Sequence, residues 1–245
     1  MPAGEEMSIV GHGDPGRAGS PGHRELGRVL DRSLPNVRPE TLDRLIATAR
    51  IRTFLPGRRI YRQGEPAPLM VILDGYGAAR RTMSSGKELV SGIAPAGVLF
   101  GWSGLASIPS SVELVALTKA EVAQWSGREV RSLVTEDPQL ALAAIDSMGA
   151  SLQQTVERIE GFLHQDARLR VLRILARHRD LFFGDPPVLP RTLLPGLVGT
   201  SREMTGRVLR GLESERLIAR VGRQALRLLE PRALDEAADV MGEAS

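Results

Sequence analysis

The stretch Val198-Gly199-Thr200-Ser201-Arg202-Glu203-Met204-Thr205-Gly206-Arg207-Val208-Leu209 decides how the C-terminal part of this chain folds. Gly199 permits a tight turn between two short helices, and Thr200 or Ser201 caps the second helix. Arg202, Glu203 and Arg207 then fall on nearby parts of one helix surface. The next two residues, Val208 and Leu209, face a core instead. This pattern predicts a helix-turn-helix whose second helix enters the major groove of DNA.

The residues that follow favour DNA binding over the alternative of an ordinary solvated helix. The segment 217–228 predicts two short strands around a Gly222-Arg223 turn, which is the pattern of a wing. Three arginines on this hairpin suit phosphate contacts: Arg220, Arg223 and Arg227. On the helix, an arginine offers a bidentate fork to guanine, and a glutamate accepts from the cytosine amino group. The sequence therefore predicts sequence-specific binding to double-stranded DNA.

Length and composition bound the class of protein. The chain has 245 residues, 42% of them hydrophobic and 25% charged, which is a globular balance and enough for two modest domains. It contains no cysteine, so disulfides and thiolate metal sites are excluded. The net charge is +3, and almost all of the positive charge comes from arginine. A high arginine content can also reflect GC-rich coding. Neither a membrane span nor a signal pattern is predicted. Because the chain is also predicted to bind DNA, we expect a cytoplasmic protein and no membrane partner.

The first half of the chain changes character twice. Residues 1–22 are rich in Gly, Pro and polar side chains, which predicts disorder. Residues 23–136 are predicted to begin with short helices and then to form a β-sandwich or barrel, because short apolar runs alternate with glycines. The candidate strands are Arg59–Tyr61, Met70–Leu73, Tyr76–Met83, Glu88–Ile93 and Val112–Leu117.

A long helix and a C-terminal domain complete the predicted order. Asp137-Pro138 resembles a helix N-cap followed by proline at the first position, so residues 137–165 are predicted to form one helix. Its apolar residues follow a heptad pattern that suits a homodimer, although packing onto the β-domain of the same chain is the alternative. The predicted dimer interface is Ile145, Met148, Leu152, Thr155, Ile159 and Phe162. Residues 166–245 then form the winged helix-turn-helix.

In this order of elements the chain resembles the Crp/Fnr family, which includes the cyclic AMP receptor proteins. Motifs such as Arg62-Gln63-Gly64-Glu65, Ile72-Leu73-Asp74-Gly75 and Gly97-Val98-Leu99-Phe100-Gly101 carry the resemblance from about residue 54 to about residue 234. It implies an α+β fold: an N-terminal cyclic-nucleotide-binding-type β-roll, a dimerisation helix and a C-terminal winged helix-turn-helix. It also implies a homodimer on a pseudo-palindromic TGTGA-like site, with RNA polymerase as a further partner.

The resemblance assigns roles to residues of the recognition helix. Arg202 contacts a guanine and Glu203 a cytosine on the opposite strand, while Arg207 contacts a further base step or the backbone. Thr200 and Ser201 cap the helix and reach phosphate. Activation or repression of transcription is not specified by these residues.

The expected effector pocket departs from the family. Its candidate residues are Gly101, Trp102, Ser110, Ser111 and Thr155. Trp102 stands where cyclic-nucleotide binders of the family have a ribose-binding Glu, and Ser110-Ser111 stands where they have the phosphate-binding Arg pair. A buried phosphate needs a compensating cation or many donors. We therefore expect no cyclic AMP binding in the usual mode.

Three interpretations of this pocket remain open. It binds nothing, it binds a flatter or more apolar effector that stacks on Trp102, or it holds haem. The candidate haem ligands are His12, His23, His164 and His178, although a surface or packing role is favoured for each of them. A regulator gated by haem or another small ligand is thus an alternative function.

Two prolines distinguish the helix-turn-helix. Pro195 lies in its first helix, where it is costly unless it falls in the first turn, and Pro190 replaces a phosphate-contacting Thr of the family. They motivate another alternative, a regulator that binds a protein partner and has a weakened DNA module. No metal-spaced cluster, nucleophile-plus-base motif or phosphate loop is present, so we predict no catalytic residues, no metal site and no enzyme activity.

Overall fold

The computed structural model describes residues 20–84 and 88–239, and the chain divides into two compact units. The first unit contains residues up to 79 together with 93–148, and the second contains 80–92 together with 149–245. Residues 1–22 were predicted to be disordered, and of these residues 1–19 lie outside the described part of the chain. Residues 21 and 22 are helical, since the helix α1 begins at Pro21 after the N-cap Ser20.

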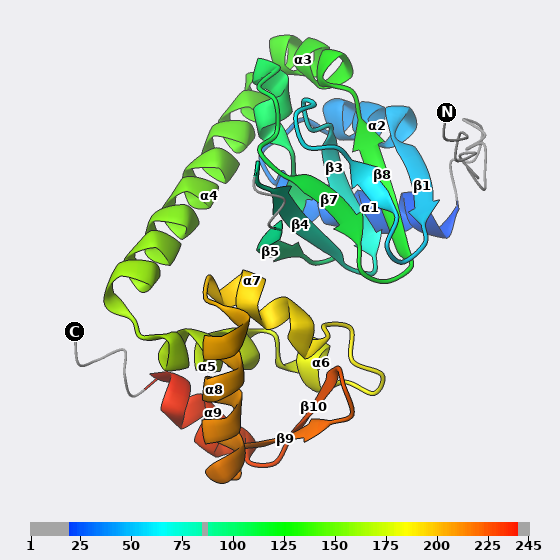
Figure 1. Cartoon of the computed structure of the whole chain (residues 1–245). Helices are drawn as coiled ribbons and strands as arrows, with labels where there is room; N and C mark the ends of the chain where they lie inside the picture. The colour runs from blue at the N-terminus through cyan, green and yellow to red at the C-terminus, as the bar shows by residue number, and fades with distance from the viewer. Residues whose placement is uncertain (1–19, 85–87, 240–245) are drawn as a thin grey trace, which may run out of the picture. The chain divides into compact units, whose positions relative to one another are not determined.

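Two antiparallel four-stranded sheets form the β-roll (Figure 1). The first sheet has the order β1-β8-β3-β6: Arg50–Phe54, Ala120–Trp125, Leu69–Asp74 and Leu99–Phe100. The second has the order β2-β7-β4-β5: Arg59–Tyr61, Glu113–Ala116, Gly77–Thr82 and Glu88–Ala94. The five strands predicted from the sequence are thus confirmed within two residues at each end. Three further strands, β1, β6 and β8, were not predicted.

The strand β3 is buried on both faces, which explains its unbroken apolar sequence. On one face Met70 and Ile72 join a small core with residues from β7 and β8. On the other face Leu69, Val71 and Leu73 join a larger core with helical residues such as Leu26. The helices contributing to this second core are α1 (Pro21–Ser33), α2 (Pro39–Thr48), α3 (Gly127–Glu136) and the start of α4 (Pro138–His164).

The second unit is built from short helices and a hairpin. Its elements after α4 are α5 (Ala167–Arg177), α6 (Arg179–Phe183), η2 (Arg191–Leu193), α7 (Leu194–Val198), α8 (Arg202–Ser214), β9 (Ile218–Val221), β10 (Ala225–Leu228) and α9 (Pro231–Asp239). Leu172, Leu194 and Leu212 are fully buried or nearly so, and they lie on α5, α7 and α8. The predicted winged helix-turn-helix is therefore confirmed as the fold of the C-terminal part.

Asp137 ties the start of α4 to the start of α2. Its side chain is buried, with Oδ1 accepting from the Gln139 backbone N–H at 3.1 Å and Oδ2 accepting from the Arg38 N–H at 2.9 Å. Burial alone raises the pKa of Asp137, but these two bonds, a hydrogen bond from Thr41 and the charge of Arg38 lower it overall. The carboxylate form is therefore the one that the fold stabilises.

Replacing Asp137 with alanine is expected to lower the free energy of unfolding by about 1–3 kcal/mol at neutral pH, because two part-buried backbone donors lose their acceptor. Since the folded-state pKa is lowered, the stabilisation is present above the ordinary value of about 3.9 and is lost as pH falls through the folded value. Urea denaturation from pH 7 to pH 3 measures this. The difference between parent and Asp137→Ala should shrink below about pH 4. A constant difference would contradict the assignment.

Candidate nucleic-acid interface and ligand pocket

A short turn joins the two helices of the helix-turn-helix. Gly199 has φ +68, the left-handed conformation that glycine adopts without strain, and it ends α7. Ser201 is the N-cap of α8, and its Oγ accepts from the Met204 N–H at 3.0 Å. Thr205, which is buried, donates from Oγ1 to the Ser201 carbonyl at 3.0 Å. The cap predicted at Thr200 or Ser201 is thus made by Ser201.

Pro195 occupies the first turn of α7, where a backbone N–H would have no partner within the helix. The proline therefore removes no internal hydrogen bond, and its carbonyl accepts from the Thr200 N–H at 3.1 Å. The helix itself is short, five residues, and follows directly on the 3-10 turn η2. Pro195 is accommodated without cost to the turn that leads into α8.

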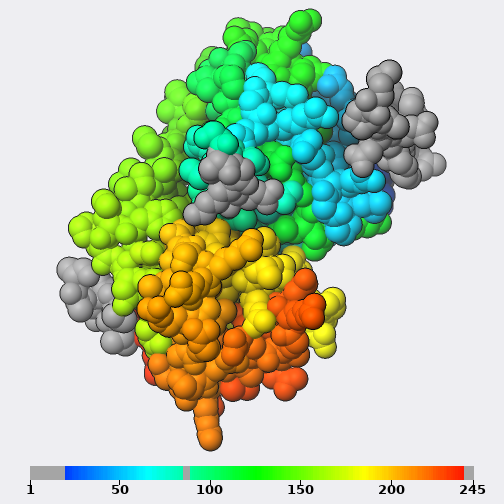
Figure 2. Space-filling view, in the orientation of Figure 1, coloured from blue at the N-terminus to red at the C-terminus, as the bar shows by residue number. Residues whose placement is uncertain are grey.

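The outer surface of α8 carries the charged residues predicted to contact bases. Arg202, Glu203 and Arg207 are all exposed, and Arg207 pairs with Glu203 at 3.3 Å. Arg210 lies one turn further on and is exposed as well, although the sequence analysis did not select it. Arg210 follows Arg207 by three residues and so shares its helix surface, and this spacing could have identified it from the sequence. Figure 2 shows the surface of α8, in orange, open on this face of the second unit.

The hairpin β9–β10 has the form of a wing, and one side chain outside it holds its tip. Arg191 of η2 donates from Nε to the Arg223 carbonyl at 2.9 Å and from Nη2 to the Gly222 carbonyl at 3.4 Å. Its backbone N–H donates to the Gln224 carbonyl at 2.8 Å. No sequence pattern identified Arg191, because these bonds join segments about thirty residues apart. The tip of the wing is therefore fixed against η2.

The arginines of the wing are not equivalent. Arg223 and Arg227 are exposed, whereas Arg220 pairs with Glu213 of α8 at 2.6 Å. The Arg220 backbone N–H also donates to Glu213 Oε1 at 2.8 Å. Two of the three predicted phosphate contacts are thus open, while Arg220 joins β9 to α8.

A second cluster connects the end of α4 to the turn of the helix-turn-helix. The guanidinium of Arg170, on α5, lies 5.6 Å from the centre of the Phe162 ring, within range of a cation–π contact. Arg170 also donates from Nε to the Val198 carbonyl at 3.1 Å and from Nη1 to the Gln165 carbonyl. The Phe162 ring lies so close to Gly199 that a Cβ there would meet it at 2.6 Å.

The apolar residues predicted as a dimer interface are exposed along α4. Ile145, Met148, Leu152, Ile159 and Phe162 have 41% to 66% of their surface exposed, and Thr155 is exposed too. Three more large apolar residues on the same helix are exposed: Leu142, Val156 and Leu163. A helix with this much exposed apolar surface has the composition of an interface.

The five candidate effector residues have separate structural roles. Gly101 has φ +97 and precedes the 3-10 turn η1 (Trp102–Ala106), and Trp102 is only 4% exposed within the core of the first unit. Ser110 donates from Oγ to the Val112 carbonyl at 2.9 Å and also bonds Tyr61, whose pKa is raised chiefly by burial. Ser111 is exposed. In the second unit, Thr155 donates to the Ser151 carbonyl at 2.8 Å within its own helix.

The candidate haem ligands are dispersed. His12 lies outside the described residues, and His23 in α1 bonds the N-cap Ser20 at 2.7 Å through Nδ1. His164 is exposed at the end of α4, and burial followed by the charge of Arg177 lowers the pKa of His178. Within residues 20–84 and 88–239, no three metal-ligating side chains lie together, and no helix there is long and apolar enough to span a membrane.

Comparison with known proteins confirms the resemblance predicted from the sequence. The family described as cyclic nucleotide-binding domain matches residues 51–137. The cAMP-activated global transcriptional regulator CRP of Salmonella typhimurium is 28% identical over 75% of this chain and 91% of its own length. The corresponding regulator Vfr of Pseudomonas aeruginosa is 27% identical over 72% and 88%. Residues 51–137 thus match the cyclic nucleotide-binding domain family, the chain resembles transcription regulators of the Crp/Fnr family, and its named relatives are regulators rather than enzymes.

Solved structures support the same conclusion. The global regulator CLP of Xanthomonas campestris, described as c-di-GMP responsive, has a TM-score of 0.65 and 26% identity. The similarity covers 79% of this chain and all of that one. A Crp/Fnr-family structure from Eubacterium rectale has a TM-score of 0.71 at 13% identity, which shows the shared fold.

The contact between Phe162 and Gly199 gives a measurable prediction. Gly199→Ala should lower the free energy of unfolding by more than the roughly 1–2 kcal/mol that a left-handed conformation costs an L-residue, because the new methyl also meets the ring. Gly222→Ala is the matched control, since Gly222 has φ +56 but no atom within 4 Å of the added Cβ. Urea denaturation of both variants measures the difference.

The double variant Gly199→Ala/Phe162→Ala should recover the excess cost, because the ring is then gone. If Gly199→Ala costs no more than Gly222→Ala, the close approach of Phe162 to the turn is wrong.

Proposed function

We propose that the chain acts as a homodimer that binds a pseudo-palindromic, TGTGA-like DNA site and does so without cyclic AMP in the usual mode. The observation that carries the proposal is the exposed face of α8 behind an intact N-cap, with Arg202, Glu203 and Arg207 at its start. Arginine and glutamate at these positions suit a guanine and a cytosine in the major groove. RNA polymerase is the further partner that the family implies.

A weakened DNA module is disfavoured by the location of Pro195. That alternative depended on a distorted first helix, and a proline in the first turn leaves the helix intact. Arg191 also fixes the wing tip, which supports a role of its exposed arginines in phosphate contacts.

The chemistry of residues 101–112 argues against cyclic AMP in the usual mode. The segment contains no lysine, arginine or histidine, so no cation there would balance a buried phosphate. The hydroxyl of Ser110 already bonds Val112, and the side chain of Trp102 belongs to the core. The relatives named as cAMP-activated, and CLP described as c-di-GMP responsive, indicate that effectors differ within this group of proteins.

Fluorescence anisotropy of a labelled duplex tests DNA recognition directly. The duplex carries TGTGA and TCACA half-sites whose centres lie about one helical turn, ~34 Å, apart. We expect tight binding that cyclic AMP does not change. Arg202→Ala should weaken binding by about 5- to 150-fold, the equivalent of about 1–3 kcal/mol.

The matched control is Arg232→Ala, which removes an exposed arginine of α9 outside the helix-turn-helix and should leave affinity almost unchanged. Equal affinity of parent and Arg202→Ala would contradict the role of Arg202. Binding that requires cyclic AMP would overturn the proposed independence from this nucleotide.

The dimer is tested by charges placed on α4. Leu152→Glu/Ile159→Glu should convert dimers to monomers, because four carboxylates would have to be buried across the two helices of a dimer. The control Ala150→Glu/Gln154→Glu adds the same charge on the opposite face of the helix and should leave dimers intact. Sedimentation velocity measures both. Dimers that persist in the first variant would refute this interface.

A further inference from the structure

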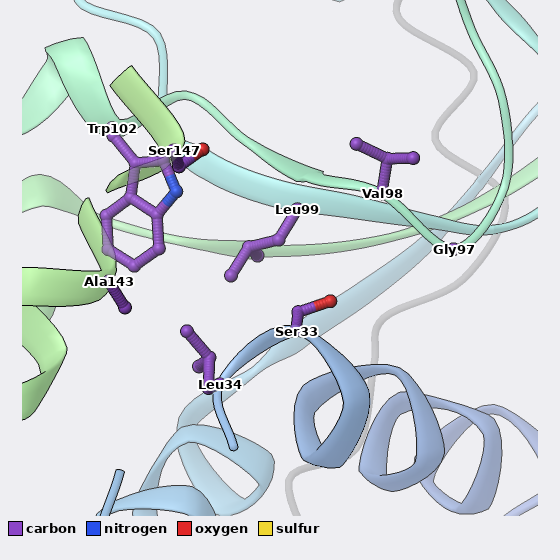
Figure 3. Close-up of a pocket in the computed structure, with 8 residues that line it drawn as sticks. All are labelled: Ser33, Leu34, Gly97, Val98, Leu99, Trp102, Ala143 and Ser147. Atoms are coloured by element: carbon purple, nitrogen blue, oxygen red, sulfur yellow. The ribbon is translucent and has the colours of Figure 1, made fainter. Parts of the chain in front are cut away.

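A small pocket lies in the first unit, and Trp102 is the one candidate effector residue that lines it. Its volume is about 210 Å³, and it is lined by the end of α1, the turn before β6, the turn η1 and the first half of α4 (Figure 3). The lining residues are Ser33, Leu34, Gly97, Val98, Leu99, Trp102, Ala143 and Ser147. Three segments far apart in the sequence, 33–34, 97–102 and 143–147, thus line one space.

Trp102 presents an unused hydrogen-bond donor to this pocket. The two tryptophans of the chain differ: Trp125 is fully buried and donates from Nε1 to the Leu45 carbonyl at 2.7 Å. Trp102 is 4% exposed, yet its indole N–H has no acceptor among the described residues. Figure 3 shows the nitrogen edge of its ring turned toward the other lining residues. This N–H is therefore open to the pocket and free to donate to an acceptor of a ligand.

Two hydroxyl groups extend the polar part of the lining. Ser33 and Ser147 make no hydrogen bond to the described residues, and both lie on the pocket wall. The rest of the wall is apolar, formed chiefly by Leu34, Leu99, Ala143 and the Trp102 ring. A ligand that fits must combine an apolar body with a cluster of hydrogen-bond acceptors at one end.

The size of the pocket limits the ligand to about one ring. An apolar cavity of about 150 Å³ is known to hold benzene, whereas pockets for drug-sized molecules have about 300–1,000 Å³. The 210 Å³ available here therefore admit a single aromatic ring or a short aliphatic chain with a polar group. A nucleotide does not fit.

A cation lies beside Gly97, one of the residues that line the pocket. Arg32 Nη2 lies 3.8 Å from the position that a Cβ on Gly97 would occupy, and Gly97 lines the pocket. Arg32 donates from Nε to the Arg28 carbonyl at 3.3 Å and forms no ion pair within the described part of the chain. An arginine beside neutral donors is the arrangement that binds a carboxylate.

We propose that this pocket binds a small organic acid whose apolar body is about one aromatic ring or a short aliphatic chain, with a carboxylate oxygen accepting from the Trp102 indole N–H and the Ser147 hydroxyl, and with the positive charge of Arg32 beside Gly97 favouring the anion. The site is independent of the proposed DNA recognition, because none of its residues belongs to the second unit. It is also separate from the serine pair expected to replace the family's phosphate-binding residues.

The indole N–H resonances of the full-length protein provide the test. With two tryptophans, a ¹⁵N-labelled sample gives two indole signals, which Trp102→Phe and Trp125→Phe assign. Titration with benzoate should shift the Trp102 signal saturably, with half-saturation below about 1 mM, and leave the Trp125 signal in place. Benzamide and benzylamine, which share the ring but lack the negative charge, should bind at least tenfold more weakly.

Three variants examine the residues separately. Arg32→Gln should weaken benzoate binding about tenfold and leave benzamide unchanged, whereas the control Arg28→Gln, one turn earlier on α1, should alter neither. Ser147→Ala should weaken benzoate binding several-fold. Ala143→Phe should fill the pocket and abolish binding, and a retained Trp125 signal would show that this variant folds.

The proposal is wrong if benzoate leaves the Trp102 signal unmoved at millimolar concentration, or if benzylamine binds as well as benzoate. It is also wrong if Ala143→Phe still binds. All these readouts are made without DNA, so they stay separate from the anisotropy test of the proposed function.

Discussion

The burial of Trp102 on the helix-facing side of the first sheet sets what the first unit is able to bind. Two glycines make it possible, because the turn η1 lies directly against the chain before β3. A Cβ on Gly101 would meet the Pro68 carbonyl oxygen at 2.1 Å, and one on Gly104 would meet the Ala67 carbonyl oxygen at 1.8 Å. The turn cannot move outward without losing the contacts of Trp102 in the larger core. Its ring is therefore committed to packing, and only its N–H edge remains available to a ligand.

Local signals in the sequence were sufficient for the DNA-binding half of the fold. Gly199 and Ser201 act through their own backbone and their immediate neighbours, so a turn followed by a capped helix could be predicted without tertiary information. Strands such as β2 and β5 were also predictable from short apolar runs between glycines. The strand β8 was missed because alanines at 120 and 123 conceal its alternation, although both are fully buried.

The ligand-binding half could not be predicted in the same way. Whether Trp102 faces a nucleotide or a core depends on its packing with α1, α3 and α4, which no local pattern encodes. The small pocket is likewise made by three separate segments, and its polar side chains are one indole and two serines that form no local sequence motif. For α4 the heptad of apolar residues was predicted to be a dimer interface, and its residues are exposed on this helix, with Leu142, Val156 and Leu163 exposed on a second flank. Leu142, Gly149, Val156 and Leu163 are spaced by seven residues and form a second line beside Ile145, Leu152 and Ile159. A partner helix therefore has two flanks of this central line on which to pack.

The arginines of the second unit differ in the free energy that is lost when their existing contacts break. The pair between Arg207 and Glu203 is exposed, and such i,i+4 pairs contribute about 0.3–0.5 kcal/mol. A good bidentate base contact contributes about 1–3 kcal/mol, so DNA can separate this pair with a net gain. Arg220 is different, because Glu213 holds both its guanidinium and its backbone N–H, and losing that carboxylate would free β9 from α8. Under the proposed function, base recognition would therefore fall to α8 and backbone contacts to Arg223 and Arg227, while Arg220 joins β9 to α8.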